Sequence, residues 1–326
     1  MHGVDPGSAQ VMFGRLRELV STAIAQTRAV AGEDSAWETP RQASRAGSEL
    51  ADQETRRPAP QAGSWPWLGA PMTARMALWA MTEQAATLPP LLNPDATSYG
   101  ADVVSRAVLE AASLAWWLLD PGIDAQQRTA RWLVWRLHTA DETRKAVAAL
   151  ELGDDEDHSG YGDNAETIWR DITELGWSVG DRAEKHAPDR PARAARKKTA
   201  LSPVVLADGR KEPWRSPTDR IADLVKNIWP QGAFPYRRLS AVAHTELWGL
   251  SLNLAPVSPG AGVPRPAPAP GTSLWLWQDA YLVAGALVLT TGRAASFLGL
   301  EEYAEPLNGL TAYLNHSMAA LRPEPG

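Results

Sequence analysis

The chain has 326 residues, a formal net charge of −6 and a hydrophobic fraction of 44%. This length can bury a sizeable core, and the composition is that of a globular protein rather than a disordered chain. The net negative charge argues against a protein that coats nucleic acid through its overall charge, although it leaves room for a local basic patch. The chain contains no cysteine. Disulfides, thiolate zinc sites and a cysteine nucleophile are therefore excluded.

Two segments bear on localisation. The first residues, MHGVDPGSAQ, contain no basic region followed by an apolar stretch, so we expect no secretory signal. The most apolar segment is AYLVAGALVLTTG, residues 280–292. It lies between the charged residues Asp279 and Arg293 and is too short to span a bilayer. The sequence therefore predicts a soluble, cytoplasmic protein without a membrane partner.

The N-terminal part divides into a helix and a polar segment. Within residues 1–31, apolar side chains recur at helical spacing, which predicts one isolated amphipathic helix. Residues 32–64 are polar, contain proline and have no apolar rhythm, so we expect a long disordered linker. In one interpretation, the N-terminal helix docks a protein partner. Its apolar positions are Met12, Leu16, Leu19, Val20, Ala23 and Ile24.

The remainder of the chain predicts an all-α helical bundle. Residues 65–255 form the expected core, residues 256–271 are a Pro-rich loop, and residues 272–326 are a helical pair that packs on the core. Ser98 and Asp124 are expected to cap two of the core helices. The one candidate strand is PVVLAD, at 203–208. Helical patterns within the core cover 70–92, 98–120, 124–150, 164–179, 216–230 and 234–254.

The segment YRRLSAVAH concentrates hydrogen-bonding groups on one predicted helix. Tyr236, Ser240 and His244 recur every four positions. At roughly 100° per residue, Arg237 lies within about 20° of His244, whereas Arg238 lies about 120° away. One face of the helix is therefore predicted to carry a polar stripe. This stripe consists of Tyr236, Arg237, Ser240 and His244.

A second polar pair lies within the otherwise apolar helix ADVVSRAVLEAASLAWWLL. Arg106 and Glu110 are spaced i and i+4, so they share one face and can form an ion pair. A buried pair of this kind is costly unless further hydrogen bonds satisfy it, and the polar stripe could supply them. We therefore expect two facing helices. They would be joined by Arg106, Glu110, Tyr236, Ser240 and His244.

The segments SRAVLEAASLAWWLLDP and YRRLSAVAHTELWGL together resemble a group of uncharacterised actinobacterial proteins. That group combines a Trp-rich R-x-x-x-E helix with a Y-x-x-x-S-x-x-x-H helix. It resembles in turn the HEPN superfamily, small helical bundles of toxin–antitoxin and other defence systems. The hallmark of the superfamily, R-x(4–6)-H on one helix, is matched from Arg237 to His244 and from Arg238 to His244. The resemblance covers residues 98–250 and implies a HEPN-like core.

The resemblance also implies a chemistry. HEPN proteins with this motif are typically metal-independent endoribonucleases that act as dimers, with two motifs at a shared cleft. It therefore implies an RNA substrate and a homodimer, with no cofactor and no metal. In such a reaction the 2′-hydroxyl attacks the adjacent phosphate. His244 would be the general acid or base, and Arg237 would stabilise charge on the phosphoryl oxygens. Tyr236 and Ser240 would orient the substrate or the imidazole.

The basic segment DRAEKHAPDRPARAARKK, residues 181–198, could hold the RNA backbone. Its densest part contains Arg193, Arg196, Lys197 and Lys198. No aromatic residue interleaves these side chains for base stacking, which favours a solvated loop as the alternative.

An acidic run, GDDEDHSGYGD, occupies residues 153–163. Its carboxylates could bind a divalent cation, and Asp163, Thr167 and Asp171 loosely resemble the second metal motif of class I terpene cyclases. The aspartate-rich partner motif of such an enzyme is missing upstream. Acidic residues also favour a helix N-terminus without any metal. We therefore expect a solvated loop and no metal site here.

Two functions remain open from the sequence. Active HEPN proteins often carry a polar, non-basic residue after the motif arginine, whereas Arg238 or Leu239 follows here. The protein is either a defence- or stress-associated ribonuclease, or a non-catalytic interaction module in which the polar cluster is structural. A catalytic cluster must be open to solvent or lie in a dimer cleft. A structural cluster must be enclosed within one subunit.

Overall fold

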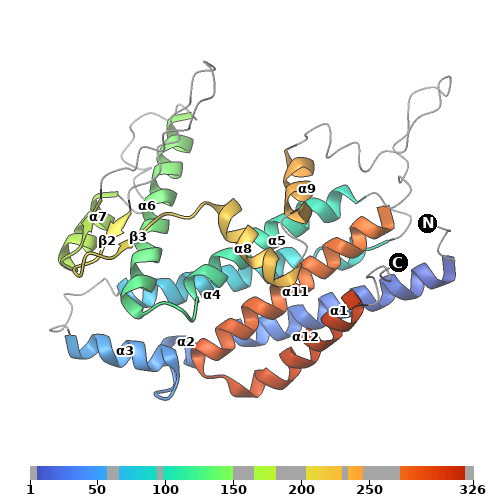
Figure 1. The fold of residues 1–326 in the computed structure, drawn as a ribbon, viewed down its shortest axis with the longest axis horizontal. Coiled ribbons are helices and arrows are strands. Elements are labelled where there is room, and N and C mark those ends of the chain that lie inside the picture. Colours follow the sequence, from blue (N-terminus) through green and yellow to red (C-terminus); the bar gives the residue numbers. More distant parts are fainter. Residues whose placement is uncertain are drawn as a thin grey trace. The chain divides into compact units, whose positions relative to one another are not determined.

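The computed structural model describes residues 6–56, 66–93, 98–149, 165–180, 203–229, 234–244 and 272–319. Helices dominate this part of the chain, which confirms the predicted all-α class (Figure 1). The helices are α1 (Pro6–Ala31), α2 (Asp34–Glu38), α3 (Arg45–Arg56), α4 (Pro66–Ala85), α5 (Tyr99–Leu118), α6 (Ala125–Ala149), α7 (Ala165–Glu174), α8 (Pro217–Ile228), α9 (Phe234–Ala243), α11 (Thr272–Leu298) and α12 (Ala304–Ala319), with the 3-10 turns η1 (Pro89–Leu91) and η3 (Glu301–Tyr303).

The chain divides into two compact units. Unit 1 comprises Met1–Ala51, Ala74–Leu119 and Pro217–Gly326, and unit 2 comprises Asp52–Thr73 and Asp120–Ser216. This division differs from the expected core over 65–255 with a helical pair added to it. Apolar patterns reveal which segments need burial, but they do not reveal which segments bury one another.

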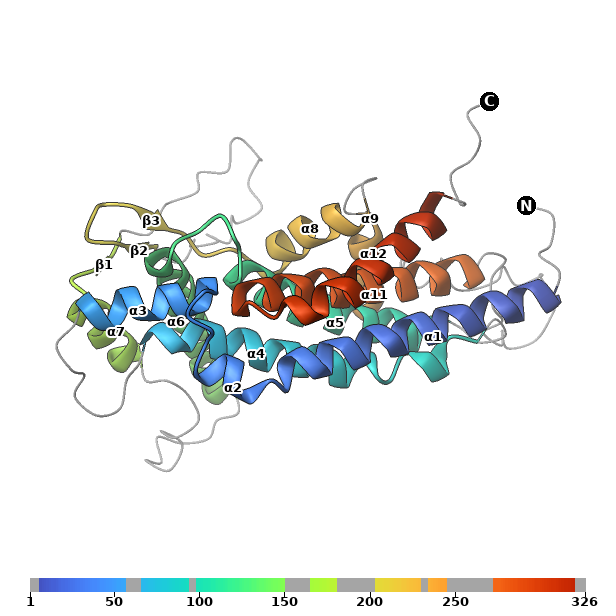
Figure 2. The ribbon, with the colours of Figure 1, turned by 90° about the horizontal axis from the view of Figure 1, so that it is seen from below.

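Unit 1 is built around α11. This helix packs against α1, α5, α8 and α12, and every residue from 276 to 288 is buried. A helix that is apolar on all sides needs neighbours all round, which explains its central place. Figure 2 shows α1, α11 and α12 running side by side.

Helix α1 is not isolated, in contrast to the sequence prediction. Its predicted apolar side lies along α11, and Phe13, Val20 and Ala31 are fully buried there. A hydrogen bond of 2.7 Å between the hydroxyls of Thr27 and Thr291 joins the two helices within their contact. The apolar face that would have docked a partner is therefore covered by the chain's own C-terminal part.

The segment expected to be a disordered linker, 32–64, forms α2 and α3 as far as residue 56. A few contacts suffice to order this polar sequence. Trp37 is buried and donates a hydrogen bond of 3.0 Å from Nε1 to the carbonyl oxygen of Val30. Ser44 Oγ accepts a hydrogen bond from the main-chain N–H of Gly47 at 3.0 Å and so caps α3. Isolated contacts such as these two hydrogen bonds produce no periodic pattern in a sequence.

Helix α11 also extends beyond the apolar segment at 280–292. Among the described residues, the stretch Ser273–Leu298 is long and apolar enough to cross a membrane, and 78% of its apolar 18-residue window is buried inside the structure. The central helix of a water-soluble bundle has the same length and composition.

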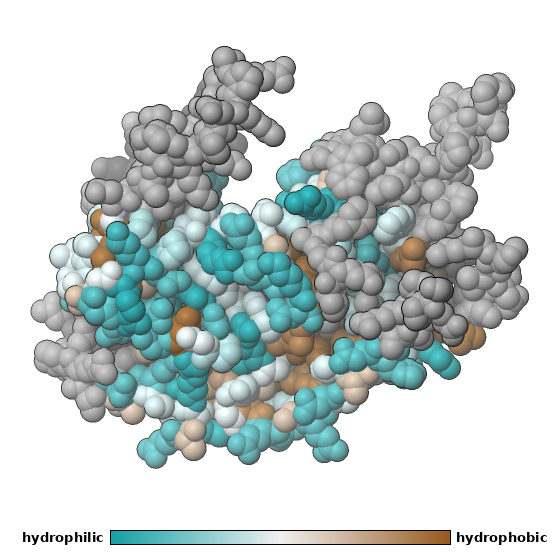
Figure 3. All heavy atoms as spheres, in the orientation of Figure 1, coloured by the Kyte–Doolittle hydropathy of each residue, from teal (hydrophilic) through white to brown (hydrophobic). Residues whose placement is uncertain are grey.

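Large apolar side chains that remain exposed are spread over several helices. They are Val11, Met76, Trp79, Val103, Trp169, Leu274 and Tyr313. The face in Figure 3 is largely hydrophilic, with smaller hydrophobic areas between. Scattered apolar side chains are normal on protein surfaces and do not by themselves indicate a binding site.

Unit 2 contains a small antiparallel sheet of three strands, β1 (Ser178–Val179), β2 (Val204–Val205) and β3 (Lys211–Glu212), in the order β1-β2-β3. The predicted strand at 203–208 is confirmed by β2. The core of the unit lies between this sheet, α6 and α7. Asp124 caps α6 as predicted, since its Oδ1 accepts a hydrogen bond of 2.8 Å from the main-chain N–H of Gln127.

The first half of α4 joins unit 2 through a close contact with α6. A Cβ atom built on Gly69 would lie 2.2 Å from Cζ2 of Trp132, so the indole ring packs directly on the glycine backbone. Trp132 also donates a hydrogen bond of 3.0 Å from Nε1 to Oγ1 of Thr73. Only glycine allows this approach at residue 69.

The close contact predicts that Gly69→Ala destabilises the protein. The new methyl group must displace the ring of Trp132, which we expect to lower the free energy of unfolding by about 1–3 kcal/mol in urea denaturation followed by circular dichroism. Gly309→Ala is the matched control, because no atom lies within 4 Å of a Cβ at that position in α12. The control should gain about 0.5–1 kcal/mol from helix propensity alone. An equally stable Gly69→Ala variant would contradict the packing described.

Candidate functional site

Three charged side chains from three helices meet inside unit 1. Arg238 on α9 donates hydrogen bonds from Nη1 to Asp102 Oδ1 on α5 and from Nη2 to Asp279 Oδ1 on α11. All three side chains are fully buried. We call this group the Arg238 triad. Because an isolated buried charge is very costly, each member depends on the others.

Burial and the neighbouring charges shift the pKa of two members of the triad. Burial raises the pKa of Asp279 well above its ordinary value of 3.8; the positive charge of Arg238 opposes this, and the negative charge of Asp102 adds to it. Burial lowers the pKa of Arg238, but the charges and hydrogen bonds of the two carboxylates outweigh it and the pKa is raised. Asp279 is thus held towards its neutral form, whereas the raised pKa of Arg238 keeps the guanidinium charged.

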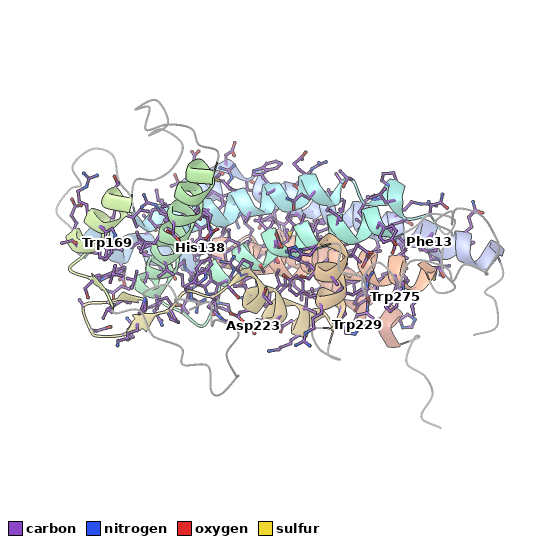
Figure 4. All side chains as sticks on the ribbon, turned by 90° about the horizontal axis from the view of Figure 1, so that it is seen from above. Phe13, His138, Trp169, Asp223, Trp229 and Trp275 are labelled. Carbon is purple, nitrogen blue, oxygen red and sulfur yellow. The ribbon has the colours of Figure 1, made fainter. Side chains whose placement is uncertain are left out.

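Further groups surround the triad. Ser98 is the N-cap residue of α5, as expected, but its Oγ donates a hydrogen bond of 3.1 Å to Asp102 Oδ2 and makes no side-chain capping bond to the main chain. The guanidinium carbon of Arg238 lies 4.9 Å from the ring centroid of Trp275, a cation–π contact. Figure 4 labels Trp275 and Trp229, which lie near α9 and the first part of α11. One aromatic ring and one hydroxyl thus contact the buried charges, while Arg238 Nε and Asp279 Oδ2 have no hydrogen-bond partner among the described residues.

The predicted polar stripe is divided by this arrangement. Tyr236 is buried with 4% of its surface exposed, Ser240 is half-buried, and Arg237 and His244 are exposed. Helix α9 is buried on more than one side because it has contacts with both α5 and α8. The buried part of its surface includes Tyr236, whereas Arg237 and His244 remain exposed.

The predicted pair on α5 does form. Arg106 donates a hydrogen bond of 2.8 Å from Nε to Oε1 of Glu110. Arg106 also donates from Nη1 to the main-chain carbonyl oxygen of Ser240, at 3.5 Å. Helices α5 and α9 therefore face one another, as expected. Their polar link runs from Arg106 to the α9 backbone, whereas the expectation was a link to the side chains of the stripe.

The centre of the site is not among the residues predicted from the sequence. Arg238 lies off the predicted polar face, and Asp102 and Asp279 belong to no predicted cluster. Asp279 gives a signal, because it interrupts a long apolar helix, whereas Asp102 lies in the first turn of α5, where an acidic residue is common. An ionisable residue inside such a helix is rarely buried without a partner. The i, i+4 rule finds pairs within one helix, and a triad across three helices lies beyond its reach.

Other predicted residues fall outside this site or outside the described residues. Asp171, considered as a metal ligand, accepts a hydrogen bond of 2.7 Å from Arg136 within unit 2, and both side chains are buried. No group of three or more metal-ligating side chains occurs among the residues that the structure describes. Residues outside the described ranges include Asp163, the acidic run 153–163, the Pro-rich loop 256–271, and the basic residues Arg193, Arg196, Lys197 and Lys198.

Comparison of the chain with protein-family models, with curated proteins and with solved structures finds no match. The chemistry of its own residues is therefore the basis for a functional proposal.

Arg238→Met should make stability strongly dependent on pH. Without the guanidinium, the buried carboxyl groups of Asp102 and Asp279 lose their positive partner, and an unpaired charge in the interior should cost about 3–5 kcal/mol of stability at pH 7. Protonation removes such a charge, so the lost stability should largely return as the pH is lowered towards 4. Urea denaturation between pH 4 and 8 measures this effect. Arg28→Met, which removes an exposed ion pair with Glu83, is the control and should change little at either pH. A loss independent of pH would contradict the argument.

Asp279→Asn tests which carboxyl holds the proton. A raised folded-state pKa means that the contribution of Asp279 to stability is fully present below its unfolded pKa and is lost as the pH rises through the folded one. We expect the free energy of unfolding of the wild type, relative to Asp279→Asn, to fall as the pH rises from about 4. Parallel pH profiles of the two proteins would show that Asp279 is not the protonated member.

Proposed function

We propose that the protein is a HEPN-like, metal-independent endoribonuclease that acts as a homodimer in defence or stress. The observation that supports this proposal is the division of α9 into a buried and an exposed side. Arg237 and His244 are exposed, as residues that touch a polymeric substrate must be. Arg238 matches the same R-x(4–6)-H spacing, but it is fully buried and cannot reach RNA.

The roles follow from the chemistry of the two exposed side chains. The imidazole of His244 can take the proton of the 2′-hydroxyl or give one to the leaving oxygen. The guanidinium of Arg237 can donate hydrogen bonds to the phosphoryl oxygens as negative charge builds on them. Ser240 lies half-buried between them along α9 and can orient the substrate. The buried Tyr236 supports the helix instead of touching RNA.

RNA cleavage by the purified protein in the presence of a chelator tests the proposal. His244→Ala should lower the rate about 10²- to 10⁴-fold, the usual contribution of general acid–base catalysis. Arg237→Ala should lower it about 10²- to 10³-fold, as the loss of one charge-stabilising donor does. His316→Ala on α12 and Arg170→Ala on α7 remove the same side-chain types from other exposed helix positions and should cut normally. Absence of cleavage by the wild type, or full activity of both α9 variants, would overturn the proposal.

A second candidate is a non-catalytic interaction module in which the polar residues only hold helices together. The contact of Arg106 with both Glu110 and the carbonyl oxygen of Ser240 favours it, because that contact joins α5 to α9 within one subunit. In that case the wild type cuts no RNA, and Arg106→Ala lowers the melting temperature while Arg237→Ala leaves it unchanged. The melting temperatures of the two variants should differ because Arg237 is exposed, whereas Arg106 has hydrogen bonds to Glu110 and Ser240.

A further inference from the structure

We infer that the Arg238 triad is a positioning device for the exposed pair on α9. It sets the rotation of this helix so that Arg237 and His244 face solvent together. This inference rests on the proposed ribonuclease function. The members of the Arg238 triad are positioning residues, because all three side chains are buried and cannot touch a substrate. Arg238 is the direct neighbour of Arg237 and lies six residues before His244.

The geometry of the guanidinium supports this role. Its two terminal nitrogens hold carboxylates that belong to different helices, α5 and α11. Because the guanidinium is planar and rigid, two such bonds fix its direction as well as its place. Successive residues of a helix are about 100° apart, so a rotation by one position would exchange Arg238 for Arg237 in the interior. The double attachment excludes that exchange.

Helix α9 needs such a device because it is short. It has 10 residues, and helices of this length are marginal on their own. Apolar packing by Leu239 and Val242 buries the helix, but apolar contacts alone specify rotation weakly. The hydrogen bond from Arg106 to the carbonyl oxygen of Ser240 adds a second fixed point, between Arg238 and His244. Two polar fixed points along one helix define both its rotation and its position.

A purely stabilising role makes a different prediction. Buried ion pairs are often replaced by apolar side chains without loss of stability, so the special contribution of the triad is orientation. The combined variant Arg238→Met, Asp102→Leu and Asp279→Leu removes every charge of the triad and leaves none unpaired. We expect it to fold with a melting temperature near that of the wild type. Its kcat for RNA should nevertheless fall about 10- to 100-fold, as for a small misplacement of reacting groups, with KM changed less than about twofold.

Arg293→Met is the matched control. Arg293 on α11 donates a hydrogen bond of 2.6 Å from Nη1 to the carbonyl oxygen of Trp116 on α5, and its guanidinium carbon lies 3.0 Å from the ring centroid of Trp116. It therefore joins α5 and α11, as the triad does, through a contact that does not include α9. We expect this variant to melt at a lower temperature and to keep the kcat of the wild type.

Amide hydrogen exchange of α9 separates the inference from the proposed function. Exchange in residues 236–244 should be faster in the combined variant and unchanged in Arg293→Met. If the wild type cuts RNA and the folded combined variant keeps its kcat and its α9 protection, the inference is wrong and the ribonuclease stands. If the wild type does not cut RNA, the proposed function fails. If, in addition, the amide protection of residues 236–244 is the same in the combined variant as in the wild type, the inferred role of the triad in orienting α9 is overturned as well. If the combined variant does not fold, Arg238→Lys is the alternative, because lysine keeps the positive charge but lacks the planar guanidinium with two terminal nitrogens. A wild-type kcat of Arg238→Lys would also overturn the inference.

Discussion

The structure of unit 1 depends on one interaction, the contact of a buried guanidinium with two buried carboxyl groups. A single arginine could not lie in this interior, and a single aspartate could not either, because the cost of removing a charge from water exceeds what apolar packing returns. The three side chains solve the problem together, and burial raises the pKa of Asp279 within the group. Since each comes from a different helix, satisfying the charges requires α5, α9 and α11 to meet at one point.

The same requirement explains why α11 is central. Its apolar surface on all sides makes it the natural core of the unit, but such a surface accepts neighbours in many orientations. Asp279 restricts this freedom at one position, because its carboxyl group accepts the hydrogen bond of Arg238 there. The hydrogen bond between Thr27 and Thr291 has a similar effect on the contact with α1, further along the helix. Polar groups within an apolar contact thus select one packing among several of similar hydrophobic energy.

The sequence predicted the helices well and their partners poorly. Apolar spacing identified α1, α5, α6 and α11, and the pairing of Arg106 with Glu110 followed from helix geometry within one element. The order within 32–56 depends on isolated anchors such as Trp37, which produce no repeating pattern. The Arg238 triad depends on contacts between residues up to 136 positions apart, and no local rule connects them. Local periodicity therefore specifies elements, whereas the site arises from their assembly.

The two adjacent arginines of α9 show how much a rotation of one residue decides. From the sequence, Arg237 and Arg238 are equally good matches to the spacing of a ribonuclease motif. In the structure, one is exposed and the other is fully buried between two carboxyl groups. The buried arginine is held by carboxyl groups of the protein, whereas its neighbour lies at the surface of α9. The same sequence spacing therefore describes two residues in opposite environments, and only the packing of α9 against its neighbours separates them.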